Sequence, residues 1–159
     1  MREHKLEFRR AGQSDSRSIY EWRVHPRARA ASRNESEFSF ESHKDWFERV
    51  LKDKKRVIYM ASERGIKIGQ IRFDQHGETE SEVSVSINPE KYGQGYGSVI
   101  IRDGSEKYLA EHSNVNVIIA EINPDNNASI RAFENAGYEY VNRKTNDTGE
   151  WEVYKLTRK

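Results

Sequence analysis

Short segments of alternating polar and apolar residues predict a protein rich in β-strands. The clearest is residues 82–87, where Val83, Val85 and Ile87 alternate with glutamate and serine, so that one face of the strand is apolar. Other segments of similar length predict the remaining strands. In chain order the predicted strands cover residues 6–10, 57–62, 66–73, 82–87, 115–122, 138–143 and 151–156.

Two helices are predicted before the second strand. Ser14 or Asp15 can cap the first helix, and Pro26 ends it. Ser39 can cap the second helix, whose apolar residues recur at helical spacing. Residues 27–37, between the two, have little apolar periodicity, so we expect a partly helical, mobile connection there.

Two further helices are predicted in the second half of the chain. One, of about 15 residues, follows a glycine-rich turn, and a short one is capped by Asn126 or Asn127 and stopped by Gly137. The strands before the glycine turn follow one another too closely for helical crossovers, so the sheet should be largely antiparallel. The order β-α-α-β-β-β-α-β-α-β-β indicates one α/β domain over residues 1–159.

Composition narrows the function. The 27 basic and 26 acidic residues nearly balance, so neither nucleic acid nor a membrane surface is expected as a partner. The chain has no cysteine, which excludes disulfides, thiolate metal sites and an acyl-cysteine intermediate. Its five histidines show no pair at ligand spacing, so no metal is expected. No apolar run reaches about 18 residues and no signal peptide is evident, so we expect a cytoplasmic protein.

The glycine-rich turn is the strongest sign of a ligand. Gly93, Gly95 and Gly97 have no Cβ to hold a ligand away from the main chain, and their N–H groups precede a helix. A phosphate-bearing cofactor suits such a turn. The NAD fingerprint fits poorly, because the third glycine comes one residue early and the setting is antiparallel, and no Gly-Lys-Ser or Gly-Lys-Thr of a P-loop follows. The structural alternative is a turn that merely closes a strand–helix corner.

Two motifs together resemble a known family. Residues 92–97 read Tyr-Gly-Gln-Gly-Tyr-Gly, and residues 123–138 read Asn-Pro-Asp-Asn-Asn-Ala-Ser-Ile-Arg-Ala-Phe-Glu-Asn-Ala-Gly-Tyr. In this order they resemble the GNAT superfamily of acetyl-CoA-dependent N-acetyltransferases, whose element order also matches this chain. The resemblance implies a mixed, mostly antiparallel sheet of about seven strands, splayed between the fourth and fifth, with about four helices. It also implies acetyl-CoA as co-substrate.

The resemblance places the cofactor on named residues. Backbone groups of Val85, Ser86 and Ile87 would pair with the pantetheine amides as an added strand would, and an N–H near Ile87 would polarise the thioester carbonyl. The pyrophosphate would lie on the N–H groups that open the helix. The cofactor-binding residues so implied are Val85, Ser86, Ile87, Tyr92, Gly93, Gln94, Gly95, Tyr96, Gly97, Ser98, Asn123, Asn126 and Phe133.

The chain departs from the family pattern in two places. Tyr92 and Gln94 stand where basic side chains are frequent, so the backbone should provide most of the grip on the pyrophosphate. Phe133 stands where many members have a tyrosine that protonates the departing thiolate, which phenylalanine cannot do. Water, or a tyrosine from elsewhere such as Tyr138 or Tyr140, would have to serve. Candidates to supply the missing charge are Lys91, Arg102 and Arg131.

Acetyl transfer to an amine requires a base, because an ammonium has no lone pair with which to attack the thioester. Glu82 is the first candidate, since it lies on the polar face of the strand that would bind the thioester and matches a glutamate frequent there in the family. Glu80 is the second candidate. The alternative for either residue is that it is only a solvated carboxylate at the edge of a strand, with no catalytic role. We expect direct attack within a ternary complex.

The first 50 residues should select the acceptor, a small-molecule amine. Residues 22–26 and 38–47 resemble amino-sugar-nucleotide N-acetyltransferases of the pseudaminic-acid pathway, where an arginine and a histidine at the places of Arg23 and His43 help bind the nucleotide-linked acceptor. The arginines at 23, 27, 29 and 33 favour an anionic acceptor. A ribosomal-protein-type N-terminal or polyamine acetyltransferase, and a non-catalytic acetyl-CoA-binding module, stay open, as does the choice between monomer and homodimer.

Overall fold

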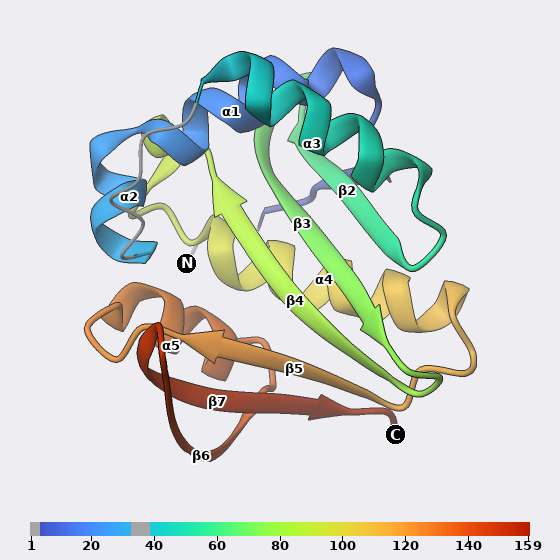
Figure 1. Cartoon of the computed structure of the whole chain (residues 1–159), viewed down its shortest axis with the longest axis vertical. Coiled ribbons are helices and arrows are strands. Elements are labelled where there is room, and N and C mark those ends of the chain that lie inside the picture. The colour runs from blue at the N-terminus through green and yellow to red at the C-terminus, as the bar shows by residue number, and fades with distance from the viewer. Residues whose placement is uncertain (1–3, 33–38) are drawn as a thin grey trace.

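A single sheet organises the part of the chain that the computed structural model describes, residues 4–32 and 39–159 (Figure 1). Its strands are β1 (Glu7–Arg10), β2 (Arg56–Glu63), β3 (Ile66–His76), β4 (Glu80–Ile87), β5 (Val117–Ile122), β6 (Glu139–Asn146) and β7 (Gly149–Thr157). Across the sheet they lie in the order β1-β2-β3-β4-β5-β7-β6. All neighbours are antiparallel except β4 and β5, which are parallel.

Helices cover both faces of this sheet. They are α1 (Ser16–Val24), α2 (Pro26–Ser32), α3 (Phe40–Lys52), α4 (Tyr96–Glu111) and α5 (Asn127–Asn135), with single 3₁₀ turns η1 (Gln13–Asp15) and η2 (Pro89–Lys91). Figure 1 shows α1 and α3 over one face and α4 behind the other. Helix α5 packs beside α4. The mixed sheet and its helices confirm the predicted GNAT-type fold.

Each face of the sheet has its own apolar core. On the α4 side, Phe73 of β3 stacks on Tyr108 of α4 with ring centroids 4.2 Å apart, and both side chains are buried. On the other side, Ile19 and Phe47 from α1 and α3 pack with Met60 of β2. Because successive strand residues point to opposite faces, the central strands are held from both sides.

Local signals located three of the helix ends correctly. The Ser39 hydroxyl oxygen accepts a hydrogen bond from the Ser42 N–H (3.1 Å) and so caps α3. The Asn126 side-chain oxygen accepts from the Ser129 N–H (3.2 Å) and caps α5. Gly137 ends α5 with a φ of 99°, a conformation that glycine adopts without steric cost.

One expectation near the N-terminus is confirmed and one needs correction. Pro26 ends α1 and also begins α2, so residues 26–32 supply the helical part of the expected connection, because proline suits the first position of a helix. The rest of the predicted connection, residues 33–37, lies outside the described residues. Asp15 stands at the start of α1 without capping it. Its carboxylate instead binds Arg9 (2.7 Å) and Lys67 (2.8 Å).

The sheet opens between β4 and β5, as predicted. Residues 80–82 of β4 pair with residues 117–119 of β5, and the ladder between these strands ends there. Strand β4 nevertheless continues to Ile87, paired with β3 on its other side. From Val83 onward its β5-facing edge is therefore available to a ligand.

Candidate active site

A cavity of about 970 Å³ occupies the opening between β4 and β5. It extends from the start of α4 and the face of α5 to the side chains of α1, α2 and α3 on the opposite side. Of the predicted cofactor-binding residues, Gln94 is not part of its wall. The residues that do line it are Val85, Ser86, Ile87, Tyr92, Gly93, Gly95, Tyr96, Gly97, Ser98, Asn123, Asn126 and Phe133.

The glycine turn leaves an open helix N-terminus at the cavity. Gly93 and Gly95 have φ values of 76° and 82°, and Gly95 is the N-cap of α4 with no side chain to cap it. A Cβ on either glycine would meet no protein atom within 4 Å. The space is therefore free for a ligand, and the first-turn N–H groups of α4 suit an anion. Gly97 differs, because its Cβ would lie 3.4 Å from that of Ala132 in α5.

A buried histidine holds this turn from the other side. The His4 Nε2 donates to the carbonyl oxygen of Gln94 (2.6 Å), and its Nδ1 lies 3.3 Å from the Glu63 carboxylate. The Tyr96 hydroxyl donates to the same carboxylate (2.6 Å), and the rings of His4 and Tyr96 stack at 3.8 Å. Sequence reasoning missed this cluster, because its members are distant along the chain.

Three cross-strand pairs line the face of β3 and β4 that α1 and α3 cover. In order from the base of the opening they are Asp74 with Glu82, Arg72 with Ser84, and Gln70 with Ser86. These three pairs form a stripe of side chains that changes from acidic to cationic to neutral. Arg72 Nε donates to both carboxylate oxygens of Asp74 (3.1 and 3.2 Å), and its Nη2 lies 3.5 Å from the Ser84 hydroxyl.

The candidate base Glu82 lies at the base of the opening, next to the cavity wall. Its side chain is 41% exposed, and one carboxylate oxygen is 3.6 Å from His76 Nε2. Burial, and then the negative charge of Glu121, raise its pKa above the ordinary value. Glu121 of β5 does line the cavity, and its carboxylate accepts a hydrogen bond from Lys144 (2.7 Å). Sequence reasoning missed Glu121, although it is the single acid of an otherwise apolar strand.

Arg23 of α1 is the main charged group of the acceptor half. It lines the cavity with its guanidinium carbon 4.8 Å from the centre of the Trp46 ring, and Arg72 lies 5.2 Å from the same ring. Burial, and then the charge of Arg72, lower the pKa of Arg23 to about 10. His43 lies behind Arg23, 1% exposed and off the cavity wall, and its Nδ1 accepts from Arg23 (3.3 Å).

His43 should make the stability of the protein depend on pH. Burial, and then the charge of Arg23, lower its pKa to about 4 from 6.5. Between these values the unfolded chain binds a proton that the folded protein excludes, so stability falls as the pH falls. We expect a loss of about 2 kcal/mol between pH 7 and pH 5. Urea unfolding at both pH values should show this loss, and His43→Gln should remove most of it; the same loss in that variant would contradict the prediction.

The thiolate side of the cavity offers no tyrosine in the expected places. Phe133 lines the wall, and Tyr138 meets it edge to face at 5.0 Å. The Tyr138 hydroxyl, however, is hydrogen-bonded to Ser105 (2.8 Å), and burial raises its pKa. Tyr140 is 53% exposed on β6. Neither is part of the wall, so neither is placed to protonate a thiolate there.

The other basic residues divide between the cavity and the surface. Lys91 and Arg131 line the cavity near the glycine turn, whereas Arg102 is paired with Asp103 (2.9 Å) and is not part of the wall. Arg27 lines the acceptor half, 4.5 Å from the centre of the Tyr92 ring. Arg29 does not line the cavity, and Arg33 lies outside the described residues.

The described residues form neither a metal centre nor a membrane-spanning helix. Among residues 4–32 and 39–159 there is no group of three or more histidine or acidic side chains that could hold a metal ion. In the same part of the chain, no helix is both long and apolar enough to cross a membrane.

Comparison with known proteins identifies an acetyltransferase family and an N-acetyltransferase relative. The family model described as an acetyltransferase (GNAT) domain matches residues 5–139. A relative from Bacillus subtilis strain 168, the uncharacterized N-acetyltransferase YfmK, is 27% identical over 107 residues, or 66% of this chain and 69% of YfmK.

Solved structures share the fold at low sequence identity. One is the aminoglycoside acetyltransferase AAC(6')-Ib in complex with paromomycin and acetyl-CoA, with a TM-score of 0.84 and 19% identity, covering 96% of this chain and 93% of the other. Another is the spermidine N-acetyltransferase of Vibrio cholerae in complex with CoA and spermine, with a TM-score of 0.84 and 15% identity, covering 96% and 95%.

Proposed function

Since this chain belongs to the GNAT acetyltransferase family and is an acetyl-CoA-dependent N-acetyltransferase, we propose that it acetylates a primary amine of a small anionic acceptor in a ternary complex. The single observation that carries this proposal is the partly buried Arg23 on the cavity wall beside Arg72. A partly desolvated cation with a like-charged neighbour is well placed to bind an anion. The finer form of the proposal is an amino-sugar nucleotide, with Arg23 on its diphosphate.

The cofactor half of the cavity suits acetyl-CoA. Strand β4 has an open edge from Val83 to its end, to which the pantetheine amides can add as a strand does, through Val85, Ser86 and Ile87. The open N-terminus of α4 suits the pyrophosphate, and Lys91 and Arg131 add positive charge nearby. Asn123 and Asn126 contribute the opposite flank.

Proton transfer completes the proposed mechanism. Glu82 takes the proton from the acceptor ammonium, directly or through water, and burial together with Glu121 keeps the Glu82 pKa raised, which brings the base closer to neutral pH. The amine nitrogen then attacks the thioester carbonyl carbon to form the C–N bond, the C–S bond breaks, and the nitrogen loses its remaining extra proton to water. Because Phe133 has no hydroxyl, we assign water as the proton donor to the thiolate.

The charge of the acceptor half also argues against polycationic acceptors. Paromomycin and spermine, present in the solved complexes, are polyamines. In this chain the acceptor half of the cavity has Arg23, Arg27 and Arg72 on its wall. Like charges in a partly desolvated cavity repel, so we expect an anionic amine to be favoured over spermidine.

Replacing Arg23 tests the acceptor assignment. Arg23→Ala should raise the KM of an anionic amine, with UDP-glucosamine as the probe, by about 10- to 100-fold, because a charge-assisted contact is lost. The affinity for acetyl-CoA should stay within about twofold of the wild type. Thiol release and calorimetry measure the two effects.

Arg17→Ala is the matched control. Arg17 is on the same helix and also stacks on an aromatic ring, that of Phe40 at 3.8 Å, but it is not part of the cavity wall. It should leave both constants unchanged. An equal loss for acceptor and acetyl-CoA in Arg23→Ala, or better turnover of spermidine than of UDP-glucosamine by the wild type, would refute the proposed acceptor class.

A further inference from the structure

Gln70 is a buried polar side chain that faces the cavity without a protein partner. It lies in the middle of β3 and is 5% exposed, so little of its side chain meets solvent. It is part of the cavity wall, and within residues 4–32 and 39–159 its side chain makes no hydrogen bond. A buried amide offers two donors and one acceptor, and leaving them unsatisfied is costly. The Gln70 amide is therefore available to hydrogen-bond a ligand in the cavity.

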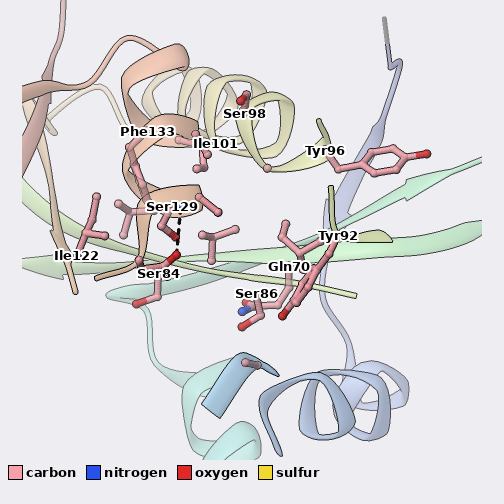
Figure 2. A pocket seen from close by; sticks show the side chains of 18 of the residues that line it. Gln70, Ser84, Ser86, Tyr92, Tyr96, Ser98, Ile101, Ile122, Ser129 and Phe133 are labelled. Carbon is pink, nitrogen blue, oxygen red and sulfur yellow. Dashed lines mark hydrogen bonds between the residues drawn. The ribbon is translucent and has the colours of Figure 1, made fainter. Parts of the chain in front are cut away.

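Two neutral hydroxyls accompany this amide. Ser86 of β4 is directly opposite Gln70 in the β3–β4 register, and Tyr92 follows on the loop before α4. Figure 2 shows the three side chains together, on the side of the cavity that faces the helices α1 to α3. Within the described residues, neither hydroxyl makes a hydrogen bond. The Arg27 guanidinium on the Tyr92 ring holds that side chain in place.

The chemistry of this cluster differs from that of its neighbours on the stripe. The pair Arg72 and Ser84, one pleat closer to Glu82, presents a cation, whereas Gln70, Ser86 and Tyr92 present uncharged donors and acceptors only. Burial raises the pKa of Tyr92, so its hydroxyl stays protonated at neutral pH. Uncharged groups that both donate and accept complement hydroxyl groups, which do the same.

We propose that Gln70, Ser86 and Tyr92 form a subsite for the ring hydroxyls of a sugar, and that Gln70 is its specificity-determining residue. The inference rests on the proposed function, because it takes the acceptor to occupy this half of the cavity. When the amine of the acceptor lies near Glu82, the anionic group of the same molecule lies by Arg72 and Arg23, and its hydroxyls lie by Gln70. A linear amine with the same anionic group leaves the buried amide unsatisfied and binds more weakly.

Two probes separate hydroxyl recognition from charge recognition. Glucosamine 1-phosphate and O-phosphoethanolamine share the same nitrogen-to-phosphorus connection through two carbons and one oxygen, and differ in the sugar ring. Calorimetry on the protein saturated with CoA gives their dissociation constants. We expect the wild type to bind glucosamine 1-phosphate about 10-fold more tightly or better. In Gln70→Met this ratio should fall to about twofold, with the affinity for O-phosphoethanolamine unchanged.

Gln75→Met is the matched control for this variant. Gln75 is on the same strand, but its amide donates to the carbonyl oxygens of Gly77 (3.1 Å) and Glu78 (3.2 Å), away from the cavity. It should keep the wild-type ratio. Equal binding of the two probes by the wild type, no binding of either, or an equal loss for both probes in Gln70→Met would each overturn the inference.

Thermal unfolding separates ligand binding from a structural role of Gln70, because loss of a structural contact would lower Tm. Because the Gln70 amide has no partner in the folded protein, Gln70→Met should leave Tm unchanged or raise it, whereas a clear fall in Tm would overturn the inference. The proposed function fails separately. If none of the amines tested supports thiol release while the ratio of the two dissociation constants persists, the subsite stands and the assigned reaction is wrong.

Discussion

Replacing Glu82 with glutamine is expected to lower kcat by about 10²- to 10³-fold while leaving acetyl-CoA affinity unchanged. Glutamine keeps the shape of the side chain but cannot take a proton from the acceptor ammonium. Glu82 lies beside the cavity wall at the base of the β4–β5 opening, where the attacking nitrogen is proposed to lie. Thiol release under acetyl-CoA saturation measures the loss.

The pH profile assigns the loss to proton transfer. Because burial and Glu121 raise the Glu82 pKa, the acid limb of kcat/KM should lie above the ordinary glutamate value of 4.5. Glu82→Gln should abolish this limb. Glu121→Gln should move it to lower pH without abolishing it, since the neighbouring negative charge that raises the pKa is gone.

Glu80→Gln is the control, because Glu80 is on the same strand but exposed and one pleat further from the cavity. It should retain wild-type activity. If Glu121→Gln removes both the activity and the acid limb while Glu82→Gln keeps them, the base is Glu121. A loss of acetyl-CoA affinity in Glu82→Gln would instead indicate damage to the cavity.

Adding one methyl group at Gly95 is expected to weaken acetyl-CoA binding by about 10- to 100-fold. The φ of 82° makes alanine cost about 1–2 kcal/mol of folding stability, but this strain is the same with and without ligand and cancels in binding. The Cβ itself would stand in open space at the helix N-terminus, where the pyrophosphate is proposed to lie. Calorimetry with acetyl-CoA measures the effect.

Gly77 offers a close control in the turn between β3 and β4. Its φ is 70°, and an added Cβ would also meet nothing within 4 Å, but it is not part of the cavity wall. Gly77→Ala should therefore lose similar stability in urea unfolding and keep the wild-type affinity for acetyl-CoA. If Gly95→Ala also keeps that affinity, the cofactor does not lie on this turn.

The features that sequence reasoning recovered depend on near neighbours in the chain. Ser39 and Asn126 cap their helices through bonds to residues three positions later, and Gly137 ends a helix through its own backbone angle. The alternation in residues 82–87 likewise specified which face of β4 is apolar. The bounds of helix α2 show the limit, because Pro26 is compatible with both a helix end and a helix start.

By itself, the sequence determined the strands, most helices and the glycine turn with its open helix N-terminus, because all of these follow from short-range sterics and periodicity. Only the tertiary structure decided which side chains meet in the cavity. Glu121 beside Glu82, His4 under the glycine turn, and the unsatisfied amide of Gln70 all arise from contacts between distant segments. Burial and pairing are properties of the packed sheet, and a linear pattern does not specify which polar group is left for a ligand.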